Sequence, residues 1–133
     1  MKLVDEPLPG LKLIEPTVFE DHRGYFFESY REDILLDMGI EKRFIQNNQS
    51  MSKATGVLRG LHFQTPPKAQ AKLIRVIQGE VLDVVVDIRK TSATYGEVYK
   101  TILSEGNRRM LYVPEGFAHG FVTTLPNTLF AYQ

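Results

Sequence analysis

Cysteine is absent from the 133-residue sequence. Its absence excludes disulfide bonds, thiolate catalysis and any metal site that is built on cysteine. An excess of charge of one sign is absent as well, because 16 basic residues balance 16 acidic residues. We therefore expect no general affinity for nucleic acid or for an anionic membrane surface. No apolar run approaches the length of a membrane span or of a signal-peptide core, which predicts a cytoplasmic protein.

The residues that are present are typical of one globular domain. Hydrophobic residues make up 43% of the chain and charged residues 24%. A chain of this length is sufficient for one hydrophobic core and short for two. Neither repeats nor Gly/Ser linkers divide it, so we expect a single domain over residues 1–133.

The secondary structure is expected to be mainly β, with one short helix. An apolar stripe formed by Ile34, Leu35 and Met38, with Gly39 after it, predicts a helix over residues 31–38. The other segments are short and separated by turn signals, which predicts a β-sandwich or barrel. Strands are expected at 11–14, 24–30, 43–46, 57–64, 72–77, 81–88, 99–103, 110–113, 117–124 and 129–133.

Residues 81–89 are informative because side chains alternate between the two faces of a strand. One face is wholly apolar, whereas the other carries Asp83 and Asp87 between valines. Such a face lines a partly polar barrel interior or forms an ordinary solvent-exposed row, and the pattern leaves both interpretations open. A small barrel is wide enough to hold one small ligand, so an interior site is physically reasonable.

Three histidines, His22, His62 and His119, are candidate acid–base or metal-ligating groups. Both His62 and His119 lie among large apolar residues, where a histidine more often has a structural role. Each is also close to a glycine, which permits a backbone bend or the close approach of a ligand. The H-x-H pair of many metal-binding barrels is absent, because the residues two before and two after His62 are Gly60 and Gln64, and we expect no metal.

Arg59, three residues before His62, suggests acid–base chemistry on an anionic ligand. Arginine binds phosphate through a bidentate fork, and Lys72 would add a point charge. Strict alternation places Arg59 and His62 on opposite faces, so a shared site requires a bulge at Gly60 or an arginine at the barrel mouth. The alternative is that Arg59 and Lys72 are solvated surface charges. No serine-nucleophile or phosphate-loop motif is present.

Five segments occur in an order that resembles a known family. They are residues 19–28 (FEDHRGYFFE), 46–50 (QNNQS), 58–64 (LRGLHFQ), 83–89 and 114–121 (PEGFAHGF). The sequence is similar to the dTDP-4-dehydrorhamnose 3,5-epimerases, which are nucleotide-sugar isomerases, and the resemblance covers nearly the whole chain. It implies a cupin-like double-stranded β-helix, or jelly roll.

The resemblance also implies a reaction that needs neither a cofactor nor a metal. The expected substrate is dTDP-4-dehydro-6-deoxy-D-glucose, and the product is dTDP-4-dehydro-L-rhamnose for rhamnose and polysaccharide biosynthesis. A base removes the proton at C3 or C5 beside the C4 ketone, and an acid returns one to the opposite face. By position in the motifs, His62 would be the base, Lys72 would stabilise the enolate, and Tyr132 would be the acid.

Substrate-binding positions are implied in the same way. Arg59 would hold the diphosphate. Arg23 would reach the nucleotide from the other subunit, because family members are homodimers that exchange amino-terminal strands. Further nucleotide-site positions are Phe19, Glu28, Gln46 and Asn48, and the sugar-pocket positions are Asp83 and His119.

The chain departs from the family after Tyr132. Family members continue past this tyrosine and there supply an aspartate that hydrogen-bonds the base histidine. This sequence ends at Gln133, so we expect His62 to lack that partner, with Asp83 or Asp87 as a candidate replacement. We also expect an unpaired strand edge and an exposed apolar patch.

Other functions stay open at this point. A single-carbon epimerase or a ketoisomerase acting on a related dTDP-sugar would use the same residues. A truncated, non-catalytic jelly roll that only binds the nucleotide sugar is an alternative of a different class.

Overall fold

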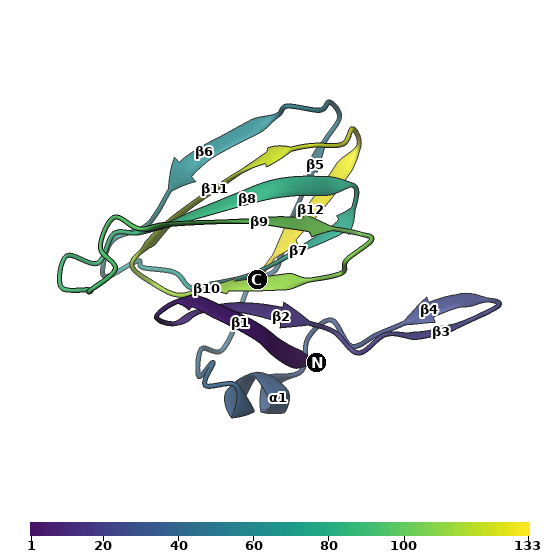
Figure 1. Ribbon diagram of the computed structural model, residues 1–133, viewed down its shortest axis with the longest axis horizontal. Helices are drawn as coiled ribbons and strands as arrows, with labels where there is room; N and C mark the ends of the chain where they lie inside the picture. Colours follow the sequence, from purple (N-terminus) through teal and green to yellow (C-terminus); the bar gives the residue numbers. More distant parts are fainter.

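The computed structural model describes residues 1–133 and consists of antiparallel strands with one short helix (Figure 1). The elements are β1 (Lys2–Leu8), β2 (Leu11–Glu15), β3 (Phe19–Asp21), β4 (Gly24–Phe26), α1 (Glu32–Asp37), β5 (Asn48–Ser52), β6 (Leu58–His62), β7 (Lys72–Gln78), β8 (Glu80–Asp87), β9 (Val98–Ser104), β10 (Met110–Val113), β11 (Phe117–Thr123) and β12 (Thr128–Tyr132). The mainly-β, jelly-roll expectation is confirmed. No helix in the protein has the length and apolar character that crossing a membrane requires.

Two sheets lie face to face and enclose the main core. One sheet has the strand order β1-β2-β10-β7-β12-β5, and the other has the order β6-β11-β8-β9. Apolar side chains from both inner faces meet between the sheets, among them Ile74 and Val76 of β7 and Phe121 of β11. Fully burying a side chain of this size contributes about 1.5–3 kcal/mol. A site between the layers therefore has rigid walls.

Strand β8 decides between the two interpretations of its carboxylate face. Val81, Asp83, Val85 and Asp87 are all fully buried, whereas the residues that alternate with them are only half-buried. The face with the two carboxylates therefore points into the sandwich, and the solvent-exposed interpretation is wrong.

The helix forms where the apolar stripe predicts it. Residue Leu35 is buried against Ile40 and against Leu73 and Met110 of the six-stranded sheet. Gly39 follows the helix with φ +78°, a left-handed conformation that glycine adopts without steric cost. The helix thus covers the outer face of β7 and β10, away from the interior.

Several strands differ from the sequence prediction. Strands β1 and β5 were not expected, because β1 is largely exposed and contains a proline, and β5 has the polar sequence NQSMS. Both are edge strands, and pairing with β2 and β12 determines their conformation. The prediction of a strand at 43–46 is wrong, as is the extension of the aromatic strand beyond Phe26. In segment 43–46, Phe44 packs edge-on against Tyr112 instead of joining a sheet.

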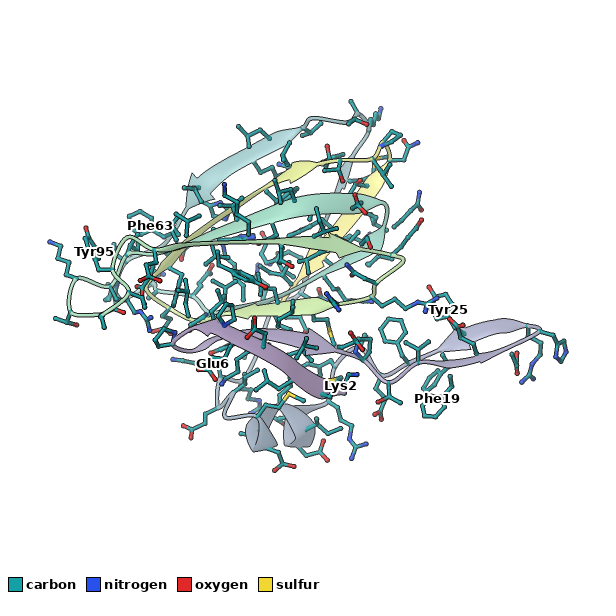
Figure 2. All side chains as sticks on the ribbon, viewed as in Figure 1. Lys2, Glu6, Phe19, Tyr25, Phe63 and Tyr95 are labelled. Atoms are coloured by element: carbon teal, nitrogen blue, oxygen red, sulfur yellow. The ribbon has the colours of Figure 1, made fainter.

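The hairpin of β3 and β4 projects from one end of the sandwich (Figures 1 and 2). Its aromatic side chains Phe19 and Phe26 are exposed, with 65% of Phe26 accessible. Arg108 attaches the hairpin to the body: its guanidinium lies 4.2 Å from the centre of the Tyr25 ring and 2.8 Å from a carboxylate oxygen of Glu20. These contacts hold the hairpin against its own chain.

Strand β6 is an edge of the four-stranded sheet. Leu58, Leu61 and the adjacent Phe63 are all exposed there. This edge of the four-stranded sheet is thus unpaired and carries apolar side chains.

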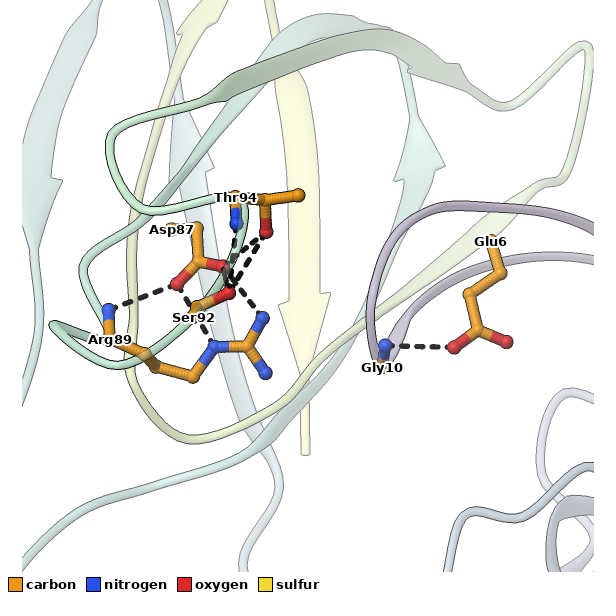
Figure 3. A network of polar contacts seen from close by, with 6 residues as sticks. All are labelled: Glu6, Gly10, Asp87, Arg89, Ser92 and Thr94. Atoms are coloured by element: carbon orange, nitrogen blue, oxygen red, sulfur yellow. Dashed lines mark hydrogen bonds and ion pairs between the residues drawn. The ribbon is translucent and has the colours of Figure 1, made fainter.

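A buried ion pair fixes the loop after β8 (Figure 3). The Asp87 carboxylate accepts hydrogen bonds from Arg89 Nε at 2.9 Å, Ser92 Oγ at 2.7 Å and Thr94 Oγ1 at 2.6 Å. These bonds, the Arg89 bond foremost, hold the pKa of Asp87 far below its usual range. Because the Arg89 guanidinium also lies 4.3 Å from the Phe117 ring centre, the loop and the start of β11 are held together.

Candidate functional site

A bulge in β6 brings the predicted anion-binding and acid–base residues to one cavity. Along the β6–β11 pair, His62 faces His119 and Arg59 faces Phe121, so three steps on β6 match two on β11. The backbones of β6 and β11 are so close here that a Cβ on Gly120 would lie 2.8 Å from the Arg59 carbonyl oxygen. Arg59 and His62 consequently line the same cavity, and of the two conditions for a shared site the bulge is the one that is met.

Residue His62 ends β6 with both ring nitrogens engaged. Its Nδ1 lies 3.1 Å from the Gly60 carbonyl oxygen, and its Nε2 lies 2.8 Å from Lys72 Nζ. The network assigns the proton to Nδ1, which donates to Gly60, and leaves the Nε2 lone pair to accept from lysine. Burial lowers the pKa of His62, and the nearby Lys72 and His119 lower it further against the opposing Gly60 bond. The imidazole is therefore a neutral base at pH 7.

Lys72 begins β7 in the opposite sheet. Burial lowers its pKa, and the negative charge of Asp83 acts against that shift. The ammonium also lies 5.8 Å from the centre of the Tyr132 ring, which comes from β12 beside it. The site thus places a neutral base on the four-stranded sheet and an ammonium and a phenol on the six-stranded sheet.

Behind His62 lies a second histidine that is paired with a carboxylate. Nε2 of His119 is 2.8 Å from Asp83 Oδ2, and the two residues are 2% and 1% exposed. The hydrogen-bond partners of His62 are Gly60 and Lys72, whereas Asp87 is bound to Arg89. The hypothesis that Asp83 or Asp87 replaces the aspartate partner of His62 is therefore wrong.

Two adjoining cavities share the side chains of His62, Lys72, His119 and Tyr132. One, of about 120 Å³, contains Arg59 and has an apolar floor, and the other, of about 110 Å³, extends toward Gln64 and Gln70. A third cavity of about 250 Å³ lies on the far side of Lys72 and Tyr132, beneath residues 42–46. The combined space is sufficient for a ligand with several distinct parts.

The structure gathers most of the predicted site residues but not all of them. Those at or next to these cavities are Gln46, Asn48, Arg59, His62, Lys72, Asp83, His119 and Tyr132. Phe19 and Arg23 lie on the projecting hairpin instead, and Arg23 pairs with its neighbour Asp21. Glu28 follows the hairpin and pairs with Arg31.

Two ring side chains in the cavity floor were missed. Phe121 and Phe130 stack with their centroids 4.1 Å apart, and the Phe130 ring lies nearly parallel to that of His119. Each lies two residues from a predicted site residue on the same strand, His119 or Tyr132. The period-two alternation of strands was therefore a signal that could have identified both. His22 lies at the turn of the hairpin, and no three His, Asp or Glu side chains of the chain converge as metal ligands.

Comparison with known proteins assigns the chain to a family. The family model of the dTDP-4-dehydrorhamnose 3,5-epimerases matches residues 5–133. The chain belongs to this family. The epimerase of Methanothermobacter thermautotrophicus is 50% identical over 132 residues, which are 99% of this chain and 70% of that protein.

Solved structures of family members have the same fold. The epimerase of Bacillus anthracis, crystallised with TDP and PPi bound, superposes with a TM-score of 0.97 and 48% identity, covering 98% of this chain and 75% of that one. The enzyme of Legionella pneumophila, in complex with dTDP-4-keto-L-rhamnose, gives a TM-score of 0.93 and 44% identity over 98% of this chain and 69% of that chain.

Proposed function

We propose that this protein is an isomerase that converts dTDP-4-dehydro-6-deoxy-D-glucose into dTDP-4-dehydro-L-rhamnose by epimerisation at C3 and C5. Family membership and the ligand of the Legionella pneumophila relative support the substrate class. The observation that carries the proposal is the neutral His62, whose Nε2 lone pair lies 2.8 Å from the Lys72 ammonium. A base and a cation side by side are what proton abstraction next to a ketone requires.

The proposed chemistry follows from the ketone at C4. That carbonyl acidifies the hydrogens on C3 and C5, so His62 Nε2 takes a proton and the electron pair moves onto the ketone oxygen. Lys72 donates a hydrogen bond to the resulting enolate oxygen. Tyr132 then returns a proton to the carbon from the opposite side. One proton leaves and one arrives, so the balance includes no oxidant or reductant.

The placement of acid and base on different sheets supports inversion. His62 comes from β6 of the four-stranded sheet, and Tyr132 comes from β12 of the six-stranded sheet. A sugar ring between them would present one face to the imidazole and the other to the phenol. Proton removal on one face and delivery on the other is the definition of epimerisation.

Nucleotide binding is proposed to involve a second copy of the chain. Arg59 and Asn48 lie beside the cavity of the catalytic residues and would bind the diphosphate, with Gln46 close to Asn48. Phe19, Arg23 and Glu28 would enter the partner's site in a homodimer that exchanges the hairpin. The exposed aromatic side chains of β3 and β4 favour this, because a two-stranded hairpin has little stability alone.

We also propose that residues 1–133 act as one cupin-like domain and that the protein is cytoplasmic. The shared core between the two sheets supports a single folding unit, since β2 and β12, far apart in sequence, both contribute to it. A nucleotide-sugar substrate is a cytoplasmic metabolite, which favours that compartment.

The test is solvent exchange in D₂O, followed by NMR at each sugar carbon. Incorporation of deuterium at both C3 and C5, lost in His62→Ala, is the expected result. Tyr132→Phe should retain exchange while losing inversion, because the base remains and the acid does not. Exchange at one carbon would instead indicate a single-carbon epimerase. Exchange at neither carbon, with dTDP still bound in calorimetry, would show a binding protein and overturn the proposal.

A further inference from the structure

The two cavities that share His62 and Lys72 have an unbalanced set of charges. Arg59 and Lys72 line them as cations, whereas no aspartate or glutamate lines either cavity. One carboxylate, that of Asp83, forms a hydrogen bond to a side chain of the lining. A charge that is 1% exposed is poorly screened and acts strongly on its surroundings. Asp83 is therefore placed to balance the cationic lining from behind.

A continuous set of contacts connects Asp83 with Lys72. Asp83 Oδ2 accepts from His119 Nε2 at 2.8 Å, and the His119 ring centre lies 5.8 Å from that of His62. Nε2 of His62 in turn accepts from Lys72 Nζ at 2.8 Å. Strands β8, β11 and β6 of one sheet thus present three members to a lysine on the opposite sheet.

Two buried atoms in this set have no hydrogen-bond partner. They are Oδ1 of Asp83 and Nδ1 of His119. A buried carboxylate with a free oxygen is destabilised unless a positive charge compensates it. An ammonium in the same interior provides that compensation, and it gains the same stabilisation in return.

We propose that Asp83 is a positioning residue for the reaction, one that keeps Lys72 in the ammonium form beside His62 and fixes His119 by accepting its Nε2 proton. The inference rests on the proposed function, because it gives the Lys72 ammonium the task of stabilising the enolate. Asp83 does not touch the substrate in this scheme. It acts through Lys72 and His119. Its loss should therefore change the pKa of Lys72 more than it changes the binding of substrate.

The other groups around Lys72 do not supply the missing negative charge. Glu115, the carboxylate near the third cavity, is held by Lys42 at 2.8 Å. Burial lowers the pKa of Lys72 and the charge of Asp83 raises it, in agreement with the proposal. The titratable and charged groups that face this region are Lys42, Arg43, Arg59, His62, Asp83, Glu115, His119 and Tyr132.

The test is Asp83→Asn, which keeps the shape of the side chain and removes its charge. With ¹³C-labelled lysine, and Lys72→Arg to assign the signal, NMR titration should show the pKa of Lys72 falling by about one to two units. The alkaline limb of kcat should move to lower pH by a similar amount, while KM stays near that of the unmodified protein. Circular dichroism establishes that the variant is folded.

Asp87→Asn is the matched control, because Asp87 is equally buried on the same face of β8 but is bound to Arg89. It should lower the melting temperature and leave the Lys72 titration in place. Asp83→Glu should return the alkaline limb part of the way. An unchanged Lys72 titration in folded Asp83→Asn, or an equal change in Asp87→Asn, overturns the proposal.

Two further outcomes are also decisive. If Asp83→Asn does not fold, the titration is made on Asp83→Ala, which also removes the charge, and there an unchanged Lys72 pKa again overturns the inference. If the unmodified protein proves inactive as an epimerase, the proposed function fails, and the NMR titration still decides whether Asp83 sets the charge of Lys72.

Discussion

At the scale of single residues, the site depends on a lysine and a histidine that lie so close together that protonation of both at once is disfavoured. The ammonium of Lys72 donates to His62 Nε2, so a proton on that nitrogen would bring two cations together. Burial acts in the same direction on both groups. The pair is therefore stable as one cation and one neutral base, which is the state that the proposed enolisation would use.

The first prediction concerns the lysine. Lys72→Met should lower kcat by about a hundredfold to a thousandfold with a small change in KM, because the lost hydrogen bond forms fully only with the enolate. Steady-state kinetics at saturating substrate measures this. Lys68→Met, at an exposed position in the loop that precedes β7, is the control and should leave kcat unchanged. An equal loss in both variants would show that general charge and not position matters.

The second prediction concerns pH. The pKa of His62 lies below its usual value of 6.5, and the base must be neutral to act. Activity should therefore persist as the pH falls through 6.5 and be lost only at lower pH, where the folded protein takes up the proton. The acid limb of kcat/KM, recorded between about pH 4.5 and 8.5 (about two units on either side of an ordinary histidine), reports this. A limb at or above 6.5 would contradict the assignment of His62 as the base.

At the scale of elements, the β6 bulge depends on the glycine that lies opposite to it on β11. The bulge turns Arg59 toward the cavity that also contains His62, and Gly120 permits the two backbones to approach. A side chain at position 120 would meet three backbone atoms of β6 at 2.8–2.9 Å. Backbone atoms cannot rotate away, so the strands would have to separate.

The third prediction follows from this contact. Gly120→Ala should reduce the free energy of unfolding by about 1–3 kcal/mol and lower activity, because it displaces β6. Chemical denaturation and steady-state kinetics measure the two effects. Gly60→Ala is a close control, since a Cβ there has no neighbour within 4 Å. If both alanines behave alike, the close approach is not what constrains the bulge.

The fourth prediction concerns the loop after β8. Asp87→Asn should lower the free energy of unfolding at neutral pH by about 2–4 kcal/mol, because Arg89 then loses its buried partner. The folded-state pKa of Asp87 is depressed, so its contribution is present above its unfolded pKa and lost as pH falls through the lower folded value. The difference in the free energy of unfolding between the variant and the unmodified protein should therefore become smaller on acidification. Urea denaturation at several pH values tests this, and a constant gap would contradict it.

The sequence predicted those elements whose pattern is local. Alternation along 81–88 identified β8, and the glycine after an apolar stripe identified α1. Edge strand β5 escaped notice because its polar residues acquire their strand conformation only by pairing with β12. From the sequence, a bulge could be named only as one way for Arg59 and His62 to share a site. Whether it forms depends on the register between β6 and β11, which no local pattern encodes. The pairing of Asp83 with His119 was not predicted either, because it also depends on the register between two strands, β8 and β11.

At the scale of the whole molecule, the cavity is a product of both sheets, and the hairpin is the part that lies outside this arrangement (Figure 1). Arg23 illustrates this, because its only ion pair is with Asp21, two residues away. The proposed role of Arg23 in nucleotide binding is therefore one that it would perform in the site of a second chain, if hairpins are exchanged as proposed.

The fifth prediction tests that requirement by complementation. Arg23→Ala and His62→Ala should each be inactive or nearly so. If hairpins are exchanged, a mixed dimer has one site with both residues intact, and random pairing should restore about a quarter of the activity of the unmodified protein. Co-expression followed by assay of the purified mixture measures this. No recovery, from a mixture shown by mass spectrometry to contain mixed dimers, would place both residues in the same subunit's site.

The separation of His62 and Tyr132 onto facing sheets has a consequence for stereochemistry. Each proposed proton-transfer group is carried by its own layer, and the stacked rings of Phe121 and Phe130 set the spacing between them. Handedness at the reacting carbon is then decided by which sheet carries each group and not by the chemical identity of either group. Exchanging one acid for another would alter the speed of the reaction, whereas changing inversion to retention would require moving a group from one layer to the other.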